Sequence, residues 1–321
     1  MRTKAWLSWL SGKRLPFILG LGLLMLIAFQ NSFTGQLQKS RKASGFFLQT
    51  QWENVYHRLG GNESLIFFCC TSGVPLLVFC ILNGTFMVVD ATGKPKFITR
   101  YRIQLGKNEP ADRQKMYNAF KTVMFNLVFI SQPMLSLMFL IMKWRTEPCS
   151  LQLPTLEWFL LEIAIFTAME EVMFYYSHRL FHHPLLYKHF HKKHHEWTAP
   201  ISISSIDIHP VEHVFSGMLP LIIGPVLLGS HVITIMVWLS LSLMTIIFAH
   251  CGYHFPFVGS SEFHDFHHLR FNQCYGVLGV LDYLHGTDKL YKQSKAYERD
   301  HILWGFTPLS ESIPDFPKRL E

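Results

Sequence analysis

Histidine is the residue type in this sequence whose number and spacing could support chemistry. The chain of 321 residues holds 18 histidines, and 15 of them lie between positions 178 and 268. Ten fall in the four short motifs HRLFH, HKKHH, HCGYH and HDFHH: His178, His182, His191, His194, His195, His250, His254, His264, His267 and His268. Neutral imidazole binds iron, zinc, copper and nickel well. Because a tetrahedral zinc takes four ligands, ten histidines are enough for two metal ions.

The spacing within the motifs predicts how the imidazoles are presented. Residues at i, i+3 and i+4 share one face of a helix, so each motif is expected to aim two or three imidazoles in one direction. His183 is an adjacent rival to His182, since a distorted helix end could exchange the two. His209, in the sequence HPVEH, is a further candidate ligand or supporting group, although Pro210 disfavours a regular helix there.

Three carboxylates are candidates for orienting the ligand imidazoles: Glu171, Asp282 and Asp288. Metal-bound histidines commonly donate their second ring nitrogen to such a group. A place at the membrane edge explains Glu171 equally well, and turn formation explains the two aspartates. Both interpretations stay open at this point.

The elements that must position these residues are five long apolar runs. The second, third and fourth each have roughly the ~20 residues that cross a bilayer. The last run is too long for one crossing and is broken by GPVLLGS at 224–230, which predicts two helices joined by a tight turn. The first run predicts an uncleaved anchor, but the basic loop after it leaves open whether it crosses. The runs are 15–29, 65–89, 123–142, 153–176 and 214–249.

Charge predicts the orientation of the chain in the membrane. The loop at 91–121 carries eight lysines and arginines, which places it in the cytosol by the positive-inside rule. The segments 178–213 and 250–321 then fall on the same side. We therefore predict an all-α integral membrane protein, a transmembrane helical bundle with a cytosolic histidine-rich di-metal helical cap.

Composition further narrows the classes of partner and of fold that the sequence allows. The net charge is +7, and the basic residues lie in loops between apolar runs. This favours a membrane surface over nucleic acid as the partner. The six cysteines form no CxxC pair, so a disulfide framework is not predicted. The expected domains are an N-terminal membrane anchor region with a basic loop at 1–150, a catalytic domain at 151–295 and a cytosolic tail at 296–321.

The four motifs in this order, with the last two after a membrane hairpin, resemble the fatty acid hydroxylase superfamily. That family includes sterol desaturases, C4-methylsterol oxidases and lipid hydroxylases. The segments HRLFHHPLLYKHFHKKHHEWTAP, HCGYHFPF, HDFHHLRFNQCYG and LDYLHGTD look most like the C4-methylsterol oxidase branch. The resemblance covers roughly residues 158–290.

The resemblance implies a membrane-bound site of two iron ions held by the ten motif histidines, with O2 as co-substrate. It also implies electrons from NADPH through cytochrome b5 or its reductase, and a multi-pass protein of the endoplasmic reticulum membrane with its active site facing the cytosol. The expected function is oxidation of a hydrophobic lipid, first a C4-methylated sterol, otherwise a fatty acyl chain or a sphingolipid. Alternatives are a metal transporter, a non-catalytic lipid regulator or, more weakly, a zinc hydrolase.

Overall fold

The computed structural model describes residues 33–315, and their regular elements are helices. The predicted anchor at 15–29 lies outside the described residues. Two isolated β-bridges, Arg102–Tyr253 and Pro256–Leu303, join loops. The predicted all-helical class is confirmed for this part of the chain. The helices are α3 (Phe33–Arg58), α4 (Glu63–Phe68), α5 (Val74–Thr92), α6 (Lys96–Thr99), α7 (Arg113–Phe125), α8 (Gln132–Arg145), α9 (Leu156–Phe181), α10 (Pro184–Leu186), α11 (Pro210–Glu212), α12 (Leu219–Leu228), α13 (Val232–His250), α14 (Glu262–Arg270), α15 (Val280–His285), α16 (Lys295–Arg299) and α17 (Leu309–Ser312).

The chain divides into two compact units, Met1–Gly61 and Asn62–Glu321. The described part of the first unit is the single helix α3 and the turn that follows it. The second unit holds the other helices and all the predicted site residues.

Four helical stretches in the second unit are long and apolar enough to cross a membrane: Glu63–Thr92, Arg113–Arg145, Pro210–Leu228 and Val232–His250. The last two form the predicted hairpin, which turns at Gly229 with a φ of 64°. A Cβ there would lie 2.6 Å from Cγ2 of Thr146, so the turn requires glycine. The predicted run at 153–176 forms α9, which carries four glutamates and is not among the four stretches.

Three of these four stretches are interrupted by a π-helical segment: Cys69–Gly73, Asn126–Ser131 and His213–Met218. Each joins two α-helices into one continuous rod, α4 to α5, α7 to α8 and α11 to α12. A π-helical segment widens the local turn and is common at functional sites.

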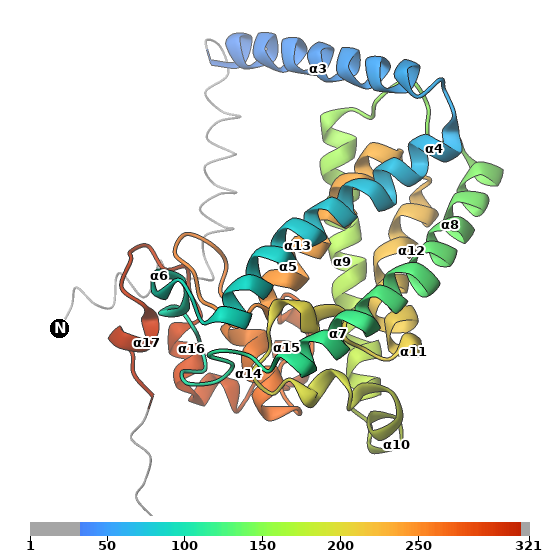
Figure 1. Ribbon diagram of the computed structural model, residues 1–321. Helices are drawn as coiled ribbons and strands as arrows, with labels where there is room; N and C mark the ends of the chain where they lie inside the picture. The colour runs from blue at the N-terminus through green and yellow to red at the C-terminus, as the bar shows by residue number, and fades with distance from the viewer. Residues whose placement is uncertain (1–32, 316–321) are drawn as a thin grey trace, which may run out of the picture. The chain divides into compact units, whose positions relative to one another are not determined.

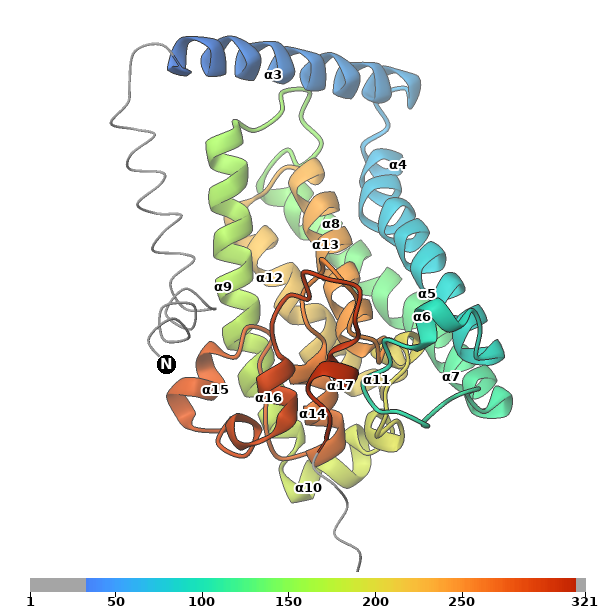
Figure 2. The same ribbon diagram turned by 90° about the vertical axis from the view of Figure 1, so that its left-hand side faces the viewer.

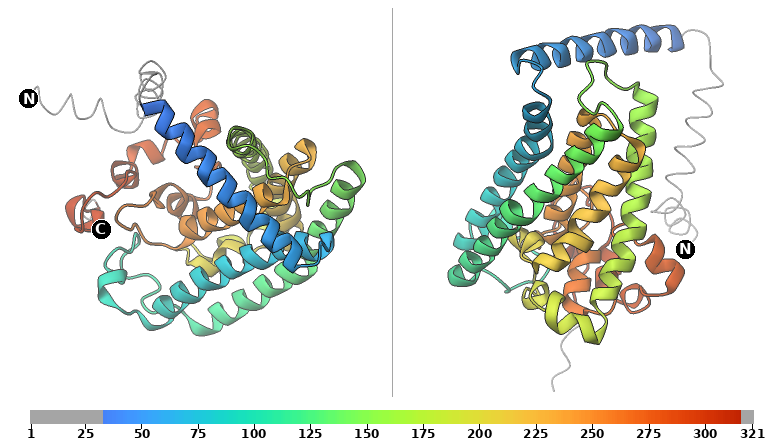
Figure 3. Two further views of the ribbon diagram at one scale, coloured as in Figure 1. Left: turned by 90° about the horizontal axis from the view of Figure 1, so that it is seen from above. Right: turned by 90° about the vertical axis from the view of Figure 1, so that its right-hand side faces the viewer.

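Within Asn62–Glu321 the long helices run side by side, and the short helices gather at one end of them (Figures 1 and 2). The helix α13 packs against α5, and α12 packs against α9. A Cβ on Gly224 would lie 2.7 Å from the ring of Phe166, so glycine lets α12 approach α9 closely. The right-hand view of Figure 3 shows α10 and the orange helices α14 and α15 at the same end of the bundle.

A buried ionic cluster joins the end of α5, the loop after α6 and the loop after α13. Arg102, 2% exposed, contacts the fully buried Asp90 with 2.6 Å between Nη2 and Oδ1. Tyr253 donates its hydroxyl to the same Oδ1 at 2.8 Å, and the guanidinium lies over its ring. Because Tyr253 is three residues beyond His250, the cluster helps set where the HCGYH motif lies.

Replacing Arg102 with alanine should destabilise the protein by about 3–5 kcal/mol, because Asp90 would then be a buried carboxylate without a cation. Thermal unfolding of the purified protein in detergent measures the change. The matched control is Arg100→Ala, since Arg100 pairs with Glu311 at 3.3 Å with both side chains about half exposed. That loss should cost about 0–1 kcal/mol. Equal effects of the two changes would contradict a stabilising role for the buried cluster.

Candidate metal centre

Nine histidines form two groups whose ring nitrogens converge. Within each group the candidate ligand atoms all lie within 4.8 Å of one another. One group contains five imidazoles and the other contains four. Group 1 is His178, His182, His191, His195 and His267, and group 2 is His194, His250, His264 and His268.

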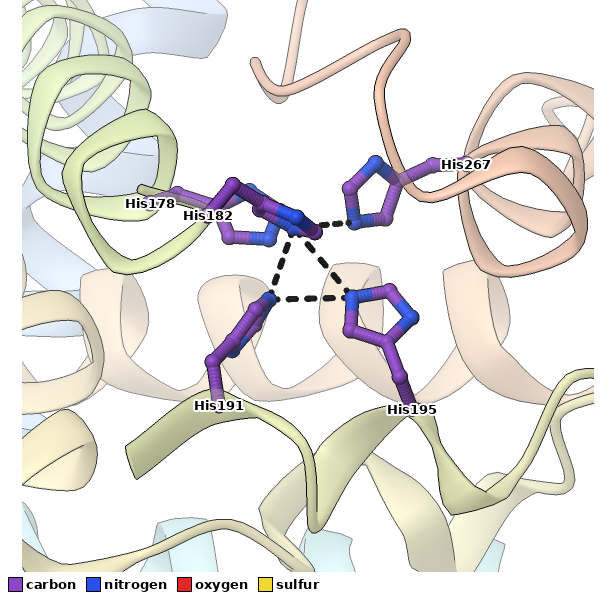
Figure 4. A group of neighbouring side chains, drawn as sticks. All are labelled: His178, His182, His191, His195 and His267. Carbon is purple, nitrogen blue, oxygen red and sulfur yellow. Dashed lines mark hydrogen bonds between the residues drawn. The ribbon is translucent and has the colours of Figure 1, made fainter. Parts of the chain in front are cut away.

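Group 1 is built from three segments (Figure 4). His178 and His182 come from the end of α9, His191 and His195 from the irregular segment 187–196, and His267 from α14. The Nε2 atom of His182 lies 2.8 Å from that of His191 and 3.2 Å from those of His195 and His267. Nε2 of His195 lies 2.9 Å from Nε2 of His191.

Group 2 uses the same arrangement with one fewer imidazole. Nε2 of His250, the last residue of α13, lies 2.8 Å from Nε2 of His264 and 3.3 Å from Nε2 of His194. Nε2 of His268 lies 3.2 Å from Nε2 of His264. The rings of His195 and His268, one from each group, have centroids 4.9 Å apart, so the two groups adjoin.

The other ring nitrogen, Nδ1, is held by an oxygen in at least five of the nine imidazoles. In group 1, Nδ1 of His178 donates to the Tyr275 carbonyl at 2.8 Å and Nδ1 of His267 to the Gln273 carbonyl at 2.7 Å. The remaining three partners are Glu212 for His191 at 2.7 Å, the Ile246 carbonyl for His250 at 2.8 Å and the Trp197 carbonyl for His268 at 2.9 Å.

These hydrogen bonds decide where the protons are. A carbonyl oxygen only accepts, so in the four rings held by carbonyls, when neutral, the proton sits on Nδ1 and the lone pair sits on Nε2. Nε2 of His182 lies within 3.2 Å of three other Nε2 atoms, those of His191, His195 and His267, and a single N–H there can donate to only one of them. A cation among the nitrogens would satisfy the lone pairs that remain. The donor set, all imidazole nitrogen, fits a first-row transition metal in each group.

Two of the four motifs are divided between the groups. His194 joins group 2, whereas His191 and His195 join group 1; likewise His267 joins group 1. HKKHH and HDFHH each aim two imidazoles at one group, as expected, but the third imidazole of each belongs to the other group. The first lies on a π-helical turn and a 3-10 turn rather than on an α-helix. In α14 only His264 and His268, four apart, share a face.

The structure places His254 outside both groups. The helix α13 ends at His250, and Gly252 turns the chain with a φ of 74°, so the four-residue spacing of HCGYH does not bring its second imidazole to the same face. Nε2 of His254 instead donates to the carbonyl of His301 at 3.0 Å, and Nδ1 lies 3.7 Å from Glu262.

The two additional histidine candidates also lie outside the groups, and both begin short helices. His183 is exposed, and its Nδ1 accepts from the backbone N–H of Leu185 at 3.3 Å at the start of α10. His209 is half-buried, and its Nδ1 accepts from the N–H of Val211 at 3.1 Å at the start of α11. Of the pair His182 and His183, the structure brings His182 to the group.

Two of the three candidate carboxylates accept hydrogen bonds from backbone N–H groups, and the third pairs with a lysine. Glu171 accepts four backbone N–H groups, those of Val277, Leu278, Val280 and Leu281, at 2.8–3.3 Å. Asp282 accepts the N–H groups of Tyr275 and Gly276. The two therefore fix the loop whose Tyr275 carbonyl orients His178, one step removed from the imidazole. Asp288 pairs with Lys292 at 2.6 Å.

Glu212 is a functional candidate that the sequence reasoning missed. It is 4% exposed, and its Oε1 lies 2.7 Å from Nδ1 of His191. The signal was present in HPVEH, where Glu212 lies three residues after the candidate His209. Glu212 is 21 residues from His191 in the sequence, and no short-range spacing rule predicts a contact between them.

A cavity of about 1000 Å³ opens onto group 2. Its walls are mainly aliphatic and aromatic side chains of the membrane-spanning stretches, and they include residues from all three of the π-helical segments described above. His250 and His264 of group 2 line it. The volume lies at the upper end of the range for ligand cavities, so the arrangement can hold a large apolar molecule beside a metal ion.

The metal-free protein should lose stability as the pH falls below about 6.5, the ordinary pKa of histidine. Burial, and then the neighbouring imidazoles, hold the pKa of His194, His195, His267 and His268 well below that value. As the pH falls, these histidines become protonated in the unfolded chain but not in the folded chain. This lowers the free energy of unfolding by about 1 kcal/mol per histidine per pH unit. Thermal unfolding in a chelator at pH 7.5 and 5.5 measures this.

A control variant is His183→Ala, which removes an exposed imidazole and should leave the pH dependence unchanged. The double variant His267→Gln/His268→Gln should reduce it. An unfolding temperature that stays level between pH 7.5 and 5.5 would show that these imidazoles are not buried together.

Comparison with known proteins agrees with this geometry. Residues 163–287 match the family model described as fatty acid hydroxylase, a range that contains the nine histidines of both groups. The chain is 58% identical over 313 residues to the human fatty acid hydroxylase domain-containing protein 2, covering 98% of this chain and 94% of that protein.

The names of two more distant relatives state an activity. A fatty acid hydroxylase of Mycosarcoma maydis is 31% identical over 242 residues, with 75% of this chain and 61% of that protein covered. Methylsterol monooxygenase 2-2 of Arabidopsis thaliana is 29% identical over 235 residues, with 70% and 86% covered. No solved structure gives a significant match. Because the human relative matches nearly the whole chain and the family model matches the segment with both histidine groups, the protein belongs to the fatty acid hydroxylase family.

Proposed function

We propose that this protein is a membrane-bound di-iron oxygenase that hydroxylates or otherwise oxidises a hydrophobic lipid. The observation that carries the proposal is the junction of two converging imidazole groups with a large apolar cavity. Breaking an unactivated C–H bond is beyond acid–base side chains, and iron bound by the two groups would supply the activation of O2. A hydroxylation consumes one O2, two electrons and two protons, places one oxygen atom in the C–H bond of the lipid and releases the other as water.

The nine histidines of groups 1 and 2 are the ligands in this proposal, and His254 is left out of the set. Glu212 and the carbonyls of Tyr275, Gln273, Ile246 and Trp197 hold the Nδ1 protons, so each ring presents its Nε2 lone pair to the metal. Glu171 and Asp282 act indirectly, by fixing the loop that carries the Tyr275 carbonyl.

The cavity suggests how substrate and water are handled. Because its walls are mainly apolar, it would accept the body of a lipid and exclude water from group 2. A C4-methylated sterol is the first choice of substrate, supported by the methylsterol monooxygenase relative. A fatty acyl chain or a sphingolipid is the second, which the relative named fatty acid hydroxylase favours.

The remaining parts of the proposal follow from the family and the membrane helices. Electrons would come from NADPH through cytochrome b5 or its reductase, and the protein would lie in the endoplasmic reticulum membrane with the imidazole groups on the cytosolic side. The domain division at 1–150, 151–295 and 296–321 stays a prediction. A metal transporter fits less well, because the histidines of both groups lie at or beyond the ends of the long helices rather than near the middle of the spans.

The purified full-length protein should contain two iron ions, and single substitutions should separate ligands from non-ligands. His267→Ala in group 1 and His264→Ala in group 2 should each lower the iron content markedly, because an incomplete donor set binds more weakly. His254→Ala is the matched control and should keep the wild-type content. Elemental analysis by mass spectrometry gives the result. Retention of both metals by the two group variants would contradict the proposed ligand set.

Filling the cavity should stop turnover without removing metal. Thr245 lines the cavity five residues before His250, and Thr245→Trp should lower turnover of a C4-methylated sterol by about 10–100-fold, because the substrate carbon can no longer reach the site. Leu227→Trp is the control, since Leu227 is 57% exposed on α12 and does not line the cavity. Product formation is followed by mass spectrometry with NADPH, cytochrome b5 and its reductase.

The same assay decides between substrates. Oxidation of a fatty acyl lipid but not of the sterol would replace the first substrate choice with the second. Absence of oxidation of either by the iron-loaded protein would contradict the proposed oxygenase.

A further inference from the structure

Three aromatic side chains form an exposed patch beyond the ends of the membrane helices. Phe257, Trp304 and Phe306 are 55%, 76% and 71% exposed. The ring of Phe257 lies 6.3 Å from that of Trp304 and 5.6 Å from that of Phe306, measured between centroids. The backbone joins the two segments, since the N–H of Phe257 donates to the carbonyl of Leu303 at 2.9 Å. We call these three residues the aromatic patch.

The two segments that carry the aromatic patch contain no charged residue. They read FPFVGSS at 255–261 and ILWGFTPL at 302–309. Contiguous aromatic surface of this kind is costly in water and marks a site of interaction. Phe and Trp side chains next to membrane helices are suited to the boundary between lipid headgroups and acyl chains.

Contacts with the spans place the aromatic patch near that boundary. Phe255 stacks on Phe86, which lies six residues before the end of α5, with 6.0 Å between centroids. Ser261 donates its hydroxyl to the carbonyl of Phe248, two residues before the end of α13, at 2.7 Å. The loop 255–261 therefore folds back along the last turns of two spans. Figures 1 and 2 show this loop, and the loop between α16 and α17, extending back along the bundle from the end where the short helices gather.

The same loop is also a wall of the cavity. The four residues after Phe257, which are Val258, Gly259, Ser260 and Ser261, all line it, together with His264 of group 2. One short segment thus separates an exposed aromatic surface from the space beside the candidate metal centre.

We propose that the aromatic patch inserts into the lipid headgroup boundary of the bilayer, and that loop 257–261 is the portal through which a lipid passes between the bilayer and the cavity. The portal role rests on the proposed function, because it assumes a lipid ligand. The insertion of the patch does not. It assigns a membrane contact to a part of the C-terminal segment 296–321, which the sequence predicted to be a cytosolic tail.

Fluorescence of Trp304 tests the insertion. The full chain is placed in phosphatidylcholine nanodiscs, and the spectrum of Trp304→Phe is subtracted from that of the wild type. The difference should be quenched by lipids brominated close to the headgroup and protected from aqueous iodide. Quenching of the difference by iodide, with none from brominated lipid, would overturn the insertion. The conservative change to Phe keeps an aromatic ring in the patch.

Transfer of a fluorescent lipid tests the portal. Dehydroergosterol or parinaric acid is supplied in donor vesicles, and energy transfer from the protein's tryptophans reports its arrival. The triple variant Phe257→Ser/Trp304→Ser/Phe306→Ser should take up the probe several-fold more slowly, with the same final occupancy and iron content. The control is Leu185→Ser, because Leu185 on α10 is apolar and 68% exposed but lies outside the patch.

The outcomes separate the two proposals. Equal uptake rates for the triple variant and the wild type would overturn the portal while leaving the oxygenase intact. Failure of the wild type to take up or oxidise either class of lipid would instead contradict the proposed function. A triple variant that loses its iron has unfolded at the site, and the rate comparison then uses the single variants Phe257→Ser and Phe306→Ser.

Discussion

The rest of the structure depends on the convergence of imidazole lone pairs. Backbone carbonyls fix the protons of four rings on Nδ1, Glu212 contacts Nδ1 of a fifth, and the Nε2 atoms converge at separations near 3 Å. Burial makes protonation of these rings costly, so a metal cation would satisfy the converging nitrogens better than an added proton. The helix ends, loops and carboxylates around the groups are organised to hold these rings in place.

The setting of the groups combines two environments that are usually separate. The membrane-spanning stretches supply an apolar cavity, and the short helices at their end supply a dense set of nitrogen ligands. Group 2 borders the cavity at His250 and His264. The π-helical segments in three spans contribute to the cavity walls, so the irregular turns occur where a large ligand would need room.

Much of the candidate site could be predicted from single residues and their spacing. Histidines four apart at the end of an apolar run, such as His178 and His182, are on one helical face by geometry alone, and the structure brings both to group 1. The predictions that fail depend on where a helix ends and how the backbone turns after it. His254 has the same spacing from His250, yet the helix ends between them and Gly252 redirects the chain. Glu212 could not be paired with His191 because the contact joins residues far apart in sequence.

The sequence by itself determined the helical class, the apolar segments, the hairpin and the supply of imidazoles, because each is a property of composition or of short-range periodicity. Only the tertiary structure decided that nine histidines divide into groups of five and four, and that HKKHH and HDFHH each serve both. It also decided that Glu171 and Asp282 hold a loop rather than a ring. The physical reason is that a ligand set is defined by distances between side chains on different elements, and these depend on how helices pack, where each one ends and which oxygen receives each Nδ1 proton.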